Sequence, residues 1–574
     1  MRNRADWGKY SQILLMIVGA SVVFAFYARY ALYINTVVEV PDEYGYLANA
    51  AYFSGTEWAS LTNLYYGWGY SLLLLPFFWI GAKGTTIIRG AILINALCTV
   101  VTYLIQIGLL SKLCKKLNKY MVVLIAFALS FCPYIMASNT KVLPESLVTL
   151  MIWLCGFILC KALETKHVRW YCLLALCMAY AFFVHTRTFV FIGTWIVMLA
   201  LMAILKEVDW KHFLLFVLLF ALFYVVGYEV KYMLIVDVYS NVVGMETSQG
   251  ITSVGNVLAV ETIIAKLKAL FTDQILVYLN SFACKFFYAA VATVGTYQLG
   301  VYAVVKSCLN KWKQQIPLST WEWVKVCFVM TSVMMICATA INSSGNLKAV
   351  GYFFYSRYYE YTLWPVAALG MEYFIESKKE WKVYAVLIAT VVASSVFVFS
   401  IYQSLESKVA SIDTCRMPAF SALAVDVDYR SMILGYLLIT VFALLVGAVL
   451  NYKEFARWAF LLLILAGFAF NNIPISSLAI NISEDIYPDN IIVDYVLDNV
   501  EEEQVYYLDA QYVSYTTRMQ ALLGIKQLDV IDIEDLGQLS GDYLLVQTGS
   551  RYSEELSGFE KVMSGHYYNL YYVE

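Results

Sequence analysis

Residues 11–51 read SQILLMIVGASVVFAFYARYALYINTVVEVPDEYGYLANAA, and they decide the fold class. The run from Ser11 to Ile34 is long enough to cross a bilayer, because about 20 apolar residues span the hydrocarbon core. It is too long for the core of a signal peptide and has no convincing small-residue cleavage site. Three basic residues lie among the ten that precede the run. We therefore expect an uncleaved helix whose N-terminus lies in the cytoplasm.

The same apolar pattern recurs along the chain. Of its 574 residues, 61% are hydrophobic and only 14% are charged, a balance typical of a polytopic membrane protein. We expect about 13 transmembrane helices. Their expected ranges are 11–34, 85–110, 120–138, 142–163, 170–184, 187–205, 210–231, 284–305, 321–342, 360–375, 381–402, 431–451 and 455–472.

The short loops support this topology. With the N-terminus inside, every short loop on the cytoplasmic side is rich in lysine and arginine, as the positive-inside bias requires. Residues 65–81 are also apolar, but counting them as a span would turn those basic loops outward. Gly67, Gly69 and Pro76 lie among aromatic residues there, which favours an interfacial helix. The outer segments are then 35–84, 232–283, 343–359 and 403–430.

The end of the chain has a different composition. From Ser483 onward there are 18 acidic and four basic residues, although the net charge of the whole chain is only −3. Helix-like and strand-like stretches alternate there, which predicts a small α/β domain. The stretches are Asn490–Val500 and Tyr512–Leu522 for helices, and Gln504–Ala510, Tyr543–Thr548 and Tyr567–Val573 for strands. We expect an all-α polytopic membrane body over 1–472 and an acidic extracytoplasmic α/β domain over 473–574. Residues 483–574 should be dispensable for folding of the body.

Several common site types find no support in the sequence. The 12 cysteines lie almost all in apolar spans or lysine-rich loops and none lies after residue 472, so no disulfide framework is expected. The four histidines are scattered, which does not suggest a histidine-built zinc site. No phosphate-binding glycine motif for a nucleotide is present, and nothing suggests a nucleic-acid partner.

Charged residues at membrane depth are costly and therefore mark candidate functional sites. In the expected topology they gather near the outer ends of helices, although they come from different loops. The group is Asp42, Glu43, Lys141, Glu145, His185, Arg187, Lys231, Asp237, Lys285, Arg357, Tyr358 and Glu360. Arginine and lysine can neutralise a phosphate, and a carboxylate can accept a proton from a hydroxyl or amine. The pattern suits a reaction on an anionic, lipid-linked substrate.

Each of these residues also has a structural interpretation. Asp42 could cap the helix that follows it, and Glu145 could be a first-turn acid. Arg187 and Lys285 could extend to the membrane interface. Arg357 is the strongest candidate cation, because an aromatic belt explains the tyrosines around it but not the arginine itself.

Four landmarks occur in a characteristic order. They are Pro41-Asp42-Glu43, then Tyr65-Tyr66-Gly67-Trp68-Gly69-Tyr70 with Pro76, then Leu143-Pro144-Glu145, and finally Arg357-Tyr358 with Pro365. In this order they resemble the GT-C superfamily glycosyltransferases that use polyprenyl-phosphate sugars. The most similar groups are the family 39-like protein O-mannosyltransferases and aminoarabinose transferases. The resemblance extends in outline from residue 11 to 472. It departs where relatives often have aspartate instead of Glu145 and lysine instead of Arg187.

The resemblance implies a function and roles for individual residues. Such an enzyme would move a sugar from a polyprenyl-phosphate donor to a glycan, lipid or protein acceptor, with inversion, on the outer face of a plasma membrane. The size and outer domain favour a bacterial one. The roles fall into three sets: Asp42 and Glu43 catalytic; Arg357, Arg187 and Lys285 for the donor phosphate; Glu145, Tyr358, Tyr65, Tyr66 and His185 for positioning the acceptor or substrate. No metal is required, although Asp42, Glu43 and Glu145 could ligate a divalent ion.

Three other functions stay open. A transporter or flippase for a lipid-linked or anionic solute would need polar residues through the bundle and broken helices at mid-depth. A lipid-linked polysaccharide polymerase or ligase would need a large outer loop, and 232–283 is moderately long. A non-enzymatic scaffold would need the acidic domain but not the Asp42 region.

Overall fold

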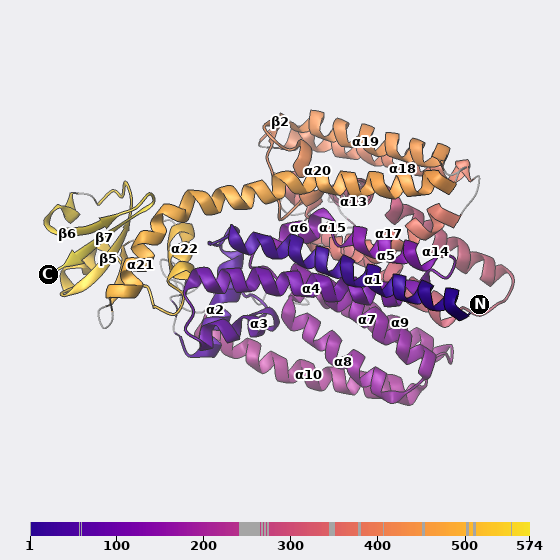
Figure 1. Ribbon diagram of the computed structural model, residues 1–574, viewed down its shortest axis with the longest axis horizontal. Coiled ribbons are helices and arrows are strands. Elements are labelled where there is room, and N and C mark those ends of the chain that lie inside the picture. Colours follow the sequence, from indigo (N-terminus) through magenta and orange to yellow (C-terminus); the bar gives the residue numbers. More distant parts are fainter. Residues whose placement is uncertain are drawn as a thin grey trace.

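The computed structural model describes residues 2–574 apart from 57, 59, 63, 240–263, 266–267, 269–270, 272–274, 344–349, 377–379, 406, 451–453, 501–503, 509–512 and 553. The chain forms an elongated helical body with a small α/β domain at one end (Figure 1). The N-terminus lies at the opposite end of the body. The expected fold class, a helical membrane body followed by an α/β domain, is confirmed.

The helices of the body run mostly along its long axis (Figure 1). They are α1 (Arg2–Ala28), α2 (Asp42–Ser54), α3 (Trp68–Trp79), α4 (Gly84–Leu113), α5 (Lys119–Leu129), α6 (Pro133–Asn139), α7 (Glu145–Thr165), α8 (Val168–Val184), α9 (Phe189–Ile204), α10 (Trp210–Asp237), α13 (Ile275–Ala292), α14 (Thr296–Lys313), α15 (Thr320–Ser343), α16 (Val350–Phe354), α17 (Glu360–Glu376), α18 (Trp381–Ser400), α19 (Tyr429–Leu450) and α20 (Glu454–Ile486). Two short 3-10 turns, η2 (Thr186–Thr188) and η3 (Ser356–Tyr358), precede α9 and α17.

Many of these helices can cross a membrane. Among the described residues, ten are long and apolar enough, or eleven if α5 and α6, which meet at 53°, form one broken span. The apolar helices α3 and α8 are shorter. At about 1.5 Å per residue, the 12 residues of α3 cover about 18 Å, less than the hydrocarbon core. This agrees with leaving residues 65–81 out of the spans.

Two expected spans are wrong as single helices. Residues 120–138 are divided between α5 and α6. Residues 284–305 are divided, because α13 ends at Ala292 and α14 begins at Thr296. Between them, Val294 and Gly295 both have positive φ, 51° and 76°, a conformation that cannot continue a right-handed helix. Elsewhere, α20 continues past the expected end at 472 to Ile486. The boundary placed between the body and the last domain therefore lies inside a continuous helix.

The C-terminal domain is a mixed sheet with two helices. Its elements are α21 (Asn490–Asn499), β3 (Val505–Leu508), α22 (Val513–Leu523), β4 (Asp529–Ile531), β5 (Asp542–Gln547), β6 (Glu560–Ser564) and β7 (Tyr568–Val573). The strand order is β4-β3-β5-β7-β6. β3 is parallel to β4 and β5, whereas β7 is antiparallel to β5 and β6. The three expected strands correspond to β3, β5 and β7, while β4 and β6 were not predicted.

This domain packs directly on the body. α22 lies between the sheet and the ends of α2 and α4 (Figure 1). The indole of Trp58 donates a hydrogen bond to the carbonyl of Gly524 at 2.9 Å, and Lys83 pairs with Asp494 at 3.2 Å. A Cβ atom on Gly84 would lie 2.0 Å from the carbonyl oxygen of Ala521. The backbones of α4 and α22 therefore approach each other so closely that only glycine fits at position 84.

A second, much smaller sheet lies in the outer segment before α19. It pairs β1 (Val409–Ala410) with β2 (Val427–Asp428) in antiparallel register. Between these strands the chain forms a compact loop that includes residues 413–417. That loop reaches the candidate site described next.

Candidate active site

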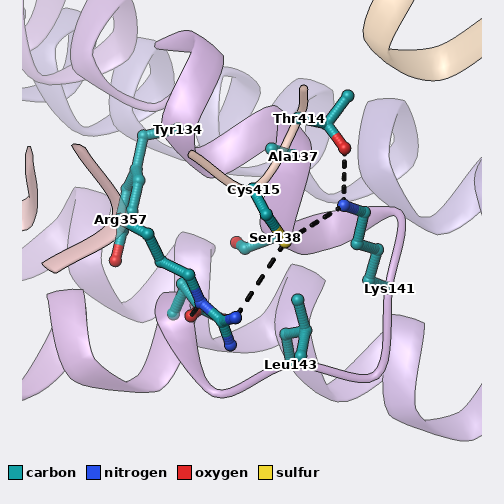
Figure 2. A pocket seen from close by; sticks show the side chains of 9 residues that line it. Tyr134, Ala137, Ser138, Lys141, Leu143, Arg357, Thr414 and Cys415 are labelled. Atoms are coloured by element: carbon teal, nitrogen blue, oxygen red, sulfur yellow. Dashed lines mark hydrogen bonds and ion pairs between the residues drawn. The ribbon is translucent and has the colours of Figure 1, made fainter. Parts of the chain in front are cut away.

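Segments that are far apart in sequence meet around one hollow of about 220 Å³ (Figure 2). They are α6 and the loop after it, the start of α7, η3, and the loop between β1 and β2. The lining residues are Tyr134, Ala137, Ser138, Lys141, Leu143, Glu145, Arg357, Thr414 and Cys415. The fold therefore assembles a polar site from residues that the sequence placed in separate outer loops.

Asp42 is the acid at the entrance of this cluster. One carboxylate oxygen accepts a hydrogen bond from the hydroxyl of Tyr66 at 2.8 Å, and the other pairs with Arg357. Its side chain remains 25% exposed. Burial alone would raise the pKa of Asp42, but the charge and hydrogen bond of Arg357 outweigh burial and hold the pKa below its ordinary value. The N-cap of α2 is Pro41, with no side-chain cap, so Asp42 is not occupied in capping the helix.

Glu43 points in a different direction from Asp42. Successive residues of an α-helix are rotated by about 100°, and Glu43 is completely buried. One oxygen accepts hydrogen bonds from the backbone amides of Val38, at 2.7 Å, and Glu39. The other accepts from the amide of Val142 at 2.6 Å. Glu43 therefore joins the first outer segment to the loop before α7, and it does not line the hollow.

The carboxylate of Glu145 forms ion pairs with two arginines. Glu145 is the first residue of α7, and one of its oxygens lies 2.5 Å from Nε of Arg357 and 3.1 Å from Nη1 of Arg187. All three side chains are buried. Its other oxygen is buried with no hydrogen-bond partner among the described residues. A carboxylate between two guanidinium groups at low dielectric fixes the position of both.

Arg187 contacts Arg357 and Glu145, which line the hollow, but does not line it itself. Its Nη1 also donates a hydrogen bond to the carbonyl of Arg357 at 3.0 Å, and its guanidinium lies 6.0 Å from the ring centre of Tyr358. The ring of His185 accepts the amide hydrogen of Arg187 at 3.2 Å and lies 6.1 Å from Tyr358. Burial, followed by the charges of the two arginines, lowers the pKa of His185. The histidine is therefore a neutral neighbour of Tyr358 at pH 7.

Lys141 is a second cation on the hollow. Its side chain is only 1% exposed. Nζ lies 3.0 Å from a carboxylate oxygen of Glu39 and 2.5 Å from the hydroxyl of Thr414, with the sulfur of Cys415 at 3.5 Å (Figure 2). Burial alone would lower the pKa of Lys141, but the neighbouring Cys415 and then the carboxylate of Glu39 keep the pKa above its ordinary value.

The remaining expected residues fall in two places. Tyr66 contacts Asp42, whereas the neighbouring Tyr65 ring faces the ammonium group of Lys231 at 5.1 Å. Lys285 lies outside the cluster on α13. Its Nζ donates to the hydroxyl of Ser281 and to the carbonyl of Phe353, both at 2.9 Å. The structure thus gathers most of the expected residues around Asp42 and Arg357, but not Lys285.

Comparison with known proteins identifies this arrangement at the level of fold. No protein-family model matches the chain, and no curated protein matches it. ArnT from Cupriavidus metallidurans bound to undecaprenyl phosphate aligns over 98% of this chain and 97% of its own, with a TM-score of 0.51 and 12% identity. Apo ArnT aligns over 98% of each chain, with a TM-score of 0.52 and 11% identity.

The chain has the GT-C fold. The oligosaccharyltransferase of Archaeoglobus fulgidus tethered to an acceptor peptide aligns over 91% of this chain and 64% of its own, with a TM-score of 0.40 and 12% identity. The expected resemblance to GT-C glycosyltransferases is confirmed as a likeness of fold. At these identities the likeness does not extend to individual residues.

The carboxylates of this site are not arranged for a metal ion. The described residues contain no group of three or more histidine, cysteine or acidic side chains that could hold one. Asp42 pairs with Arg357, Glu43 accepts backbone amides, and Glu145 lies between two arginines. A divalent cation would have to displace these partners and lie beside positive charge. The three acids therefore do not fit the role of metal ligands.

Sequence reasoning missed several residues of this site. Lys141 was recognised as a charge at an outer helix end but was not assigned to the site. Glu39 forms its ion pair, and Thr414 and Cys415 complete its surroundings. The last two are uncharged residues in a loop without a motif. Only their place in the outer segment 403–430 marked them, so no sequence signal could have selected them.

Proposed function

We propose that this protein is a membrane glycosyltransferase that moves a hexosyl or pentosyl unit from a polyprenyl-phosphate donor to an acceptor, with inversion. The observation that carries the proposal is the pairing of a partly exposed carboxylate, Asp42, with Arg357, which lines one hollow together with a second cation, Lys141. A GT-C fold supports the same reaction class. The acceptor is a glycan, a lipid or a protein.

Two cations suit the donor phosphate. Arg357 and Lys141 both line the hollow, and the hydroxyls of Tyr134, Ser138 and Thr414 belong to residues of the same lining. A phosphate there would receive charge-assisted hydrogen bonds from groups that are already buried and held in place. Arg187 reaches Arg357 and Glu145 instead, so we assign it to positioning. We assign Lys285 no direct contact with the phosphate.

Asp42 suits the role of general base. It combines partial exposure with a direct pairing to Arg357, one of the two cations that line the hollow. Tyr66 fixes one of its oxygens by hydrogen bond, which orients the carboxylate. Glu43 contacts backbone amides alone, and we propose that it maintains the loops and takes no proton. Tyr65, Tyr358 and His185 lie nearby as candidates for positioning the acceptor or the sugar.

The reaction can be written as one displacement. The acceptor oxygen or nitrogen attacks the anomeric carbon while its proton moves to Asp42. The bond between that carbon and the phosphate oxygen breaks, and the electron pair leaves with the phosphate. Arg357 and Lys141 stabilise the additional negative charge on the departing polyprenyl phosphate. A single attack opposite to the leaving group inverts the anomeric centre. No step requires a metal ion or another cofactor.

The lysine- and arginine-rich short loops predict the orientation of the chain in the membrane. The N-terminus and the acidic domain lie at opposite ends of the body (Figure 1), as an odd number of spans would place them. We propose that the N-terminus is cytoplasmic and that the site and the α/β domain face outward from a bacterial plasma membrane. This places the reaction where a polyprenyl-phosphate sugar can present its headgroup while its tail stays in the bilayer.

A transporter is the second candidate, because one feature favours it. The 53° break between α5 and α6 adjoins a buried hollow of about 270 Å³. Its lining includes Thr99, Thr102, Gln106 and Ser130 but no carboxylate or cation, whereas transport of an anionic solute calls for charged groups along the path. The polymerase alternative depends on segment 232–283, most of which lies outside the described residues.

A cellular experiment tests the proposed function. Surface glycans, lipids and proteins would be compared by mass spectrometry in cells lacking the protein and in cells carrying wild type, Asp42→Asn or Asp413→Asn at matched membrane levels. Asp413 lies in the β1–β2 loop, pairs with Arg416 and is not a lining residue. We expect one glycan component to be lost in the null and Asp42→Asn cells and retained with Asp413→Asn. Full restoration by Asp42→Asn would contradict the proposal.

A further inference from the structure

Arg357 pairs with two carboxylates, and these two carboxylates differ in their other partners. Its Nη1 pairs with Asp42 and its Nε with Glu145. Glu145 has a second cation, because Arg187 lies 3.1 Å from the same oxygen. Among the described residues, the other partner of Asp42 is the neutral hydroxyl of Tyr66. Within the described part of the chain, Arg357 is thus the single cation paired with Asp42.

The same guanidinium faces the hollow. Arg357 lines it, with Nη1 directed toward the sulfur of Cys415 at 4.0 Å (Figure 2). Nη2 makes no hydrogen bond with any described residue. Lys141 lines the hollow as well. An anion bound there would therefore contact the group that holds Asp42.

We propose that Asp42 and the donor phosphate share the guanidinium of Arg357, so that charge gained by the phosphate during transfer releases Asp42 to act as the base. This inference rests on the proposed function and describes how the same site is controlled. In the resting site Asp42 is neutralised by Arg357 and is a weak base. The base therefore becomes effective only where a donor phosphate is present.

The charge changes of the reaction support this control. In the donor, the phosphate is a diester with one negative charge. When its bond to the anomeric carbon breaks, the phosphate keeps the electron pair and becomes a monoester with up to two negative charges. The stronger anion attracts Arg357 more strongly, and the weakened pairing increases the proton affinity of Asp42. The acceptor proton reaches Asp42 as this happens, so the charges on both sides of Arg357 change together.

Thermodynamic linkage gives a test that does not depend on turnover. If bound phosphate weakens the Asp42–Arg357 pair, then Asp42 must weaken phosphate binding by the same factor. Replacing Asp42 with asparagine removes the competing charge and nearly preserves the shape. The variant should therefore bind the lipid phosphate more tightly than wild type, although it cannot catalyse transfer. Couplings between sites usually amount to about 5- to 150-fold, and we expect about 5-fold or more.

The experiment compares binding of a polyprenyl monophosphate to the full chain in lipid nanodiscs. The proteins are wild type, Asp42→Asn, Asp42→Ser and the control Asp413→Asn. Asp413 pairs with Arg416 at 3.3 Å, so the control removes a nearby negative charge without removing a partner of Arg357. We expect tighter binding by both Asp42 variants and a change within about twofold for the control. The corresponding polyprenyl alcohol, which lacks the phosphate, should bind all four proteins equally.

The outcomes separate the two proposals. If wild type does not bind the monophosphate in preference to the alcohol, the proposed function is wrong. If wild type binds it but neither Asp42 variant binds more tightly, the sharing of Arg357 is wrong. Equal tightening by Asp413→Asn would also overturn the sharing, because it would show a general effect of charge. Melting curves establish that each variant is folded, and Asp42→Ser replaces Asp42→Asn if the latter is not.

Discussion

The carboxylate of Glu43 accepts a hydrogen bond from the backbone amide of Val142 at 2.6 Å, across 99 positions of sequence. This bond connects the segment that carries Asp42 to the loop that leads into Glu145. Because Glu43 is completely buried, water cannot replace its partners easily. One carboxylate therefore sets the distance between the two acidic motifs of the site, while its neighbour in sequence, Asp42, pairs with Arg357.

The different surroundings of these adjacent acids predict opposite effects of substitution. Glu43→Gln would direct an amide nitrogen at a backbone donor, and a buried donor left unpaired costs about 1–3 kcal/mol of folding free energy. Asp42→Asn removes one ion pair of a partly exposed side chain and should lower the melting temperature only modestly, but it should lower turnover by about 10²- to 10⁴-fold, the usual contribution of a general base. Melting curves and turnover of the purified variants check this. Wild-type melting with lost turnover in Glu43→Gln would instead indicate that Glu43 takes part in the chemistry.

Glu145 should be the most sensitive acid for stability. Replacing it with glutamine leaves Arg187 and Arg357 buried without their shared counter-charge, which typically costs about 3–5 kcal/mol. Glu164→Gln is the matched control, because Glu164 pairs with Lys112 at 2.7 Å on a more exposed surface. There the expected loss is about 1 kcal/mol or less. The yield of folded protein and its melting temperature measure both. Similar losses of folding free energy at the two sites would show that burial does not increase the contribution of the ion pairs of Glu145.

The two buried lysines should separate binding from stability. Lys141 lines the hollow and Lys285 does not. Lys141→Met should raise the KM for the lipid donor and lower turnover, because it removes one of the two cations near the phosphate. Lys285→Met should change the melting temperature without changing the KM. Steady-state kinetics with varied donor, performed on both variants, decide between these outcomes. An increase in KM for Lys285→Met alone would reverse the assignment.

The sequence predicted this architecture wherever composition changes sharply. Apolar runs bounded by basic loops located most helices, and the acidic end located the α/β domain. The break in 284–305 was not predicted, because Thr293 and Val294 are ordinary residues in an apolar run and only Gly295 could have signalled the turn. Periodicity does not reveal a single change in the sign of φ.

The candidate site was predictable in its charges but not in its pairings. Asp42, Glu145 and Arg357 could be selected because each is a charge near an outer helix end. Which of Asp42 and Glu43 pairs with Arg357 depends on how α2 packs, and that depends on the loop around Val142. Thr414 and Cys415 contribute through position alone. Their contact with Lys141 spans more than 270 residues of sequence.

The ion pairs of the site predict a loss of stability in acid. Burial would raise the pKa of Asp42 and of Glu39, but Arg357 and Lys141 hold these pKa values below their ordinary values of 3.8 and 4.5. A carboxyl whose pKa is lowered by folding stabilises the protein above its ordinary pKa and loses that contribution as the pH falls. Melting temperatures of wild type should therefore decline below about pH 5. The double variant Asp42→Asn/Glu39→Gln should decline less, and an identical decline would contradict this account.

The close packing of the C-terminal domain predicts that its position matters to the reaction even if the body folds without it. Trp58, whose indole contacts Gly524, packs on the first outer segment beside Tyr44 of α2. Gly84→Val would place a Cβ about 2.0 Å from the Ala521 carbonyl and force α22 away from the body without deleting the domain. We expect normal membrane insertion, faster proteolysis of the displaced domain and reduced turnover, because α2 loses its outer support. Gly467→Val on α20 is the control, since nothing lies within 4 Å of its added Cβ. If Gly84→Val releases the domain and turnover is unchanged, then the domain has no part in positioning Asp42.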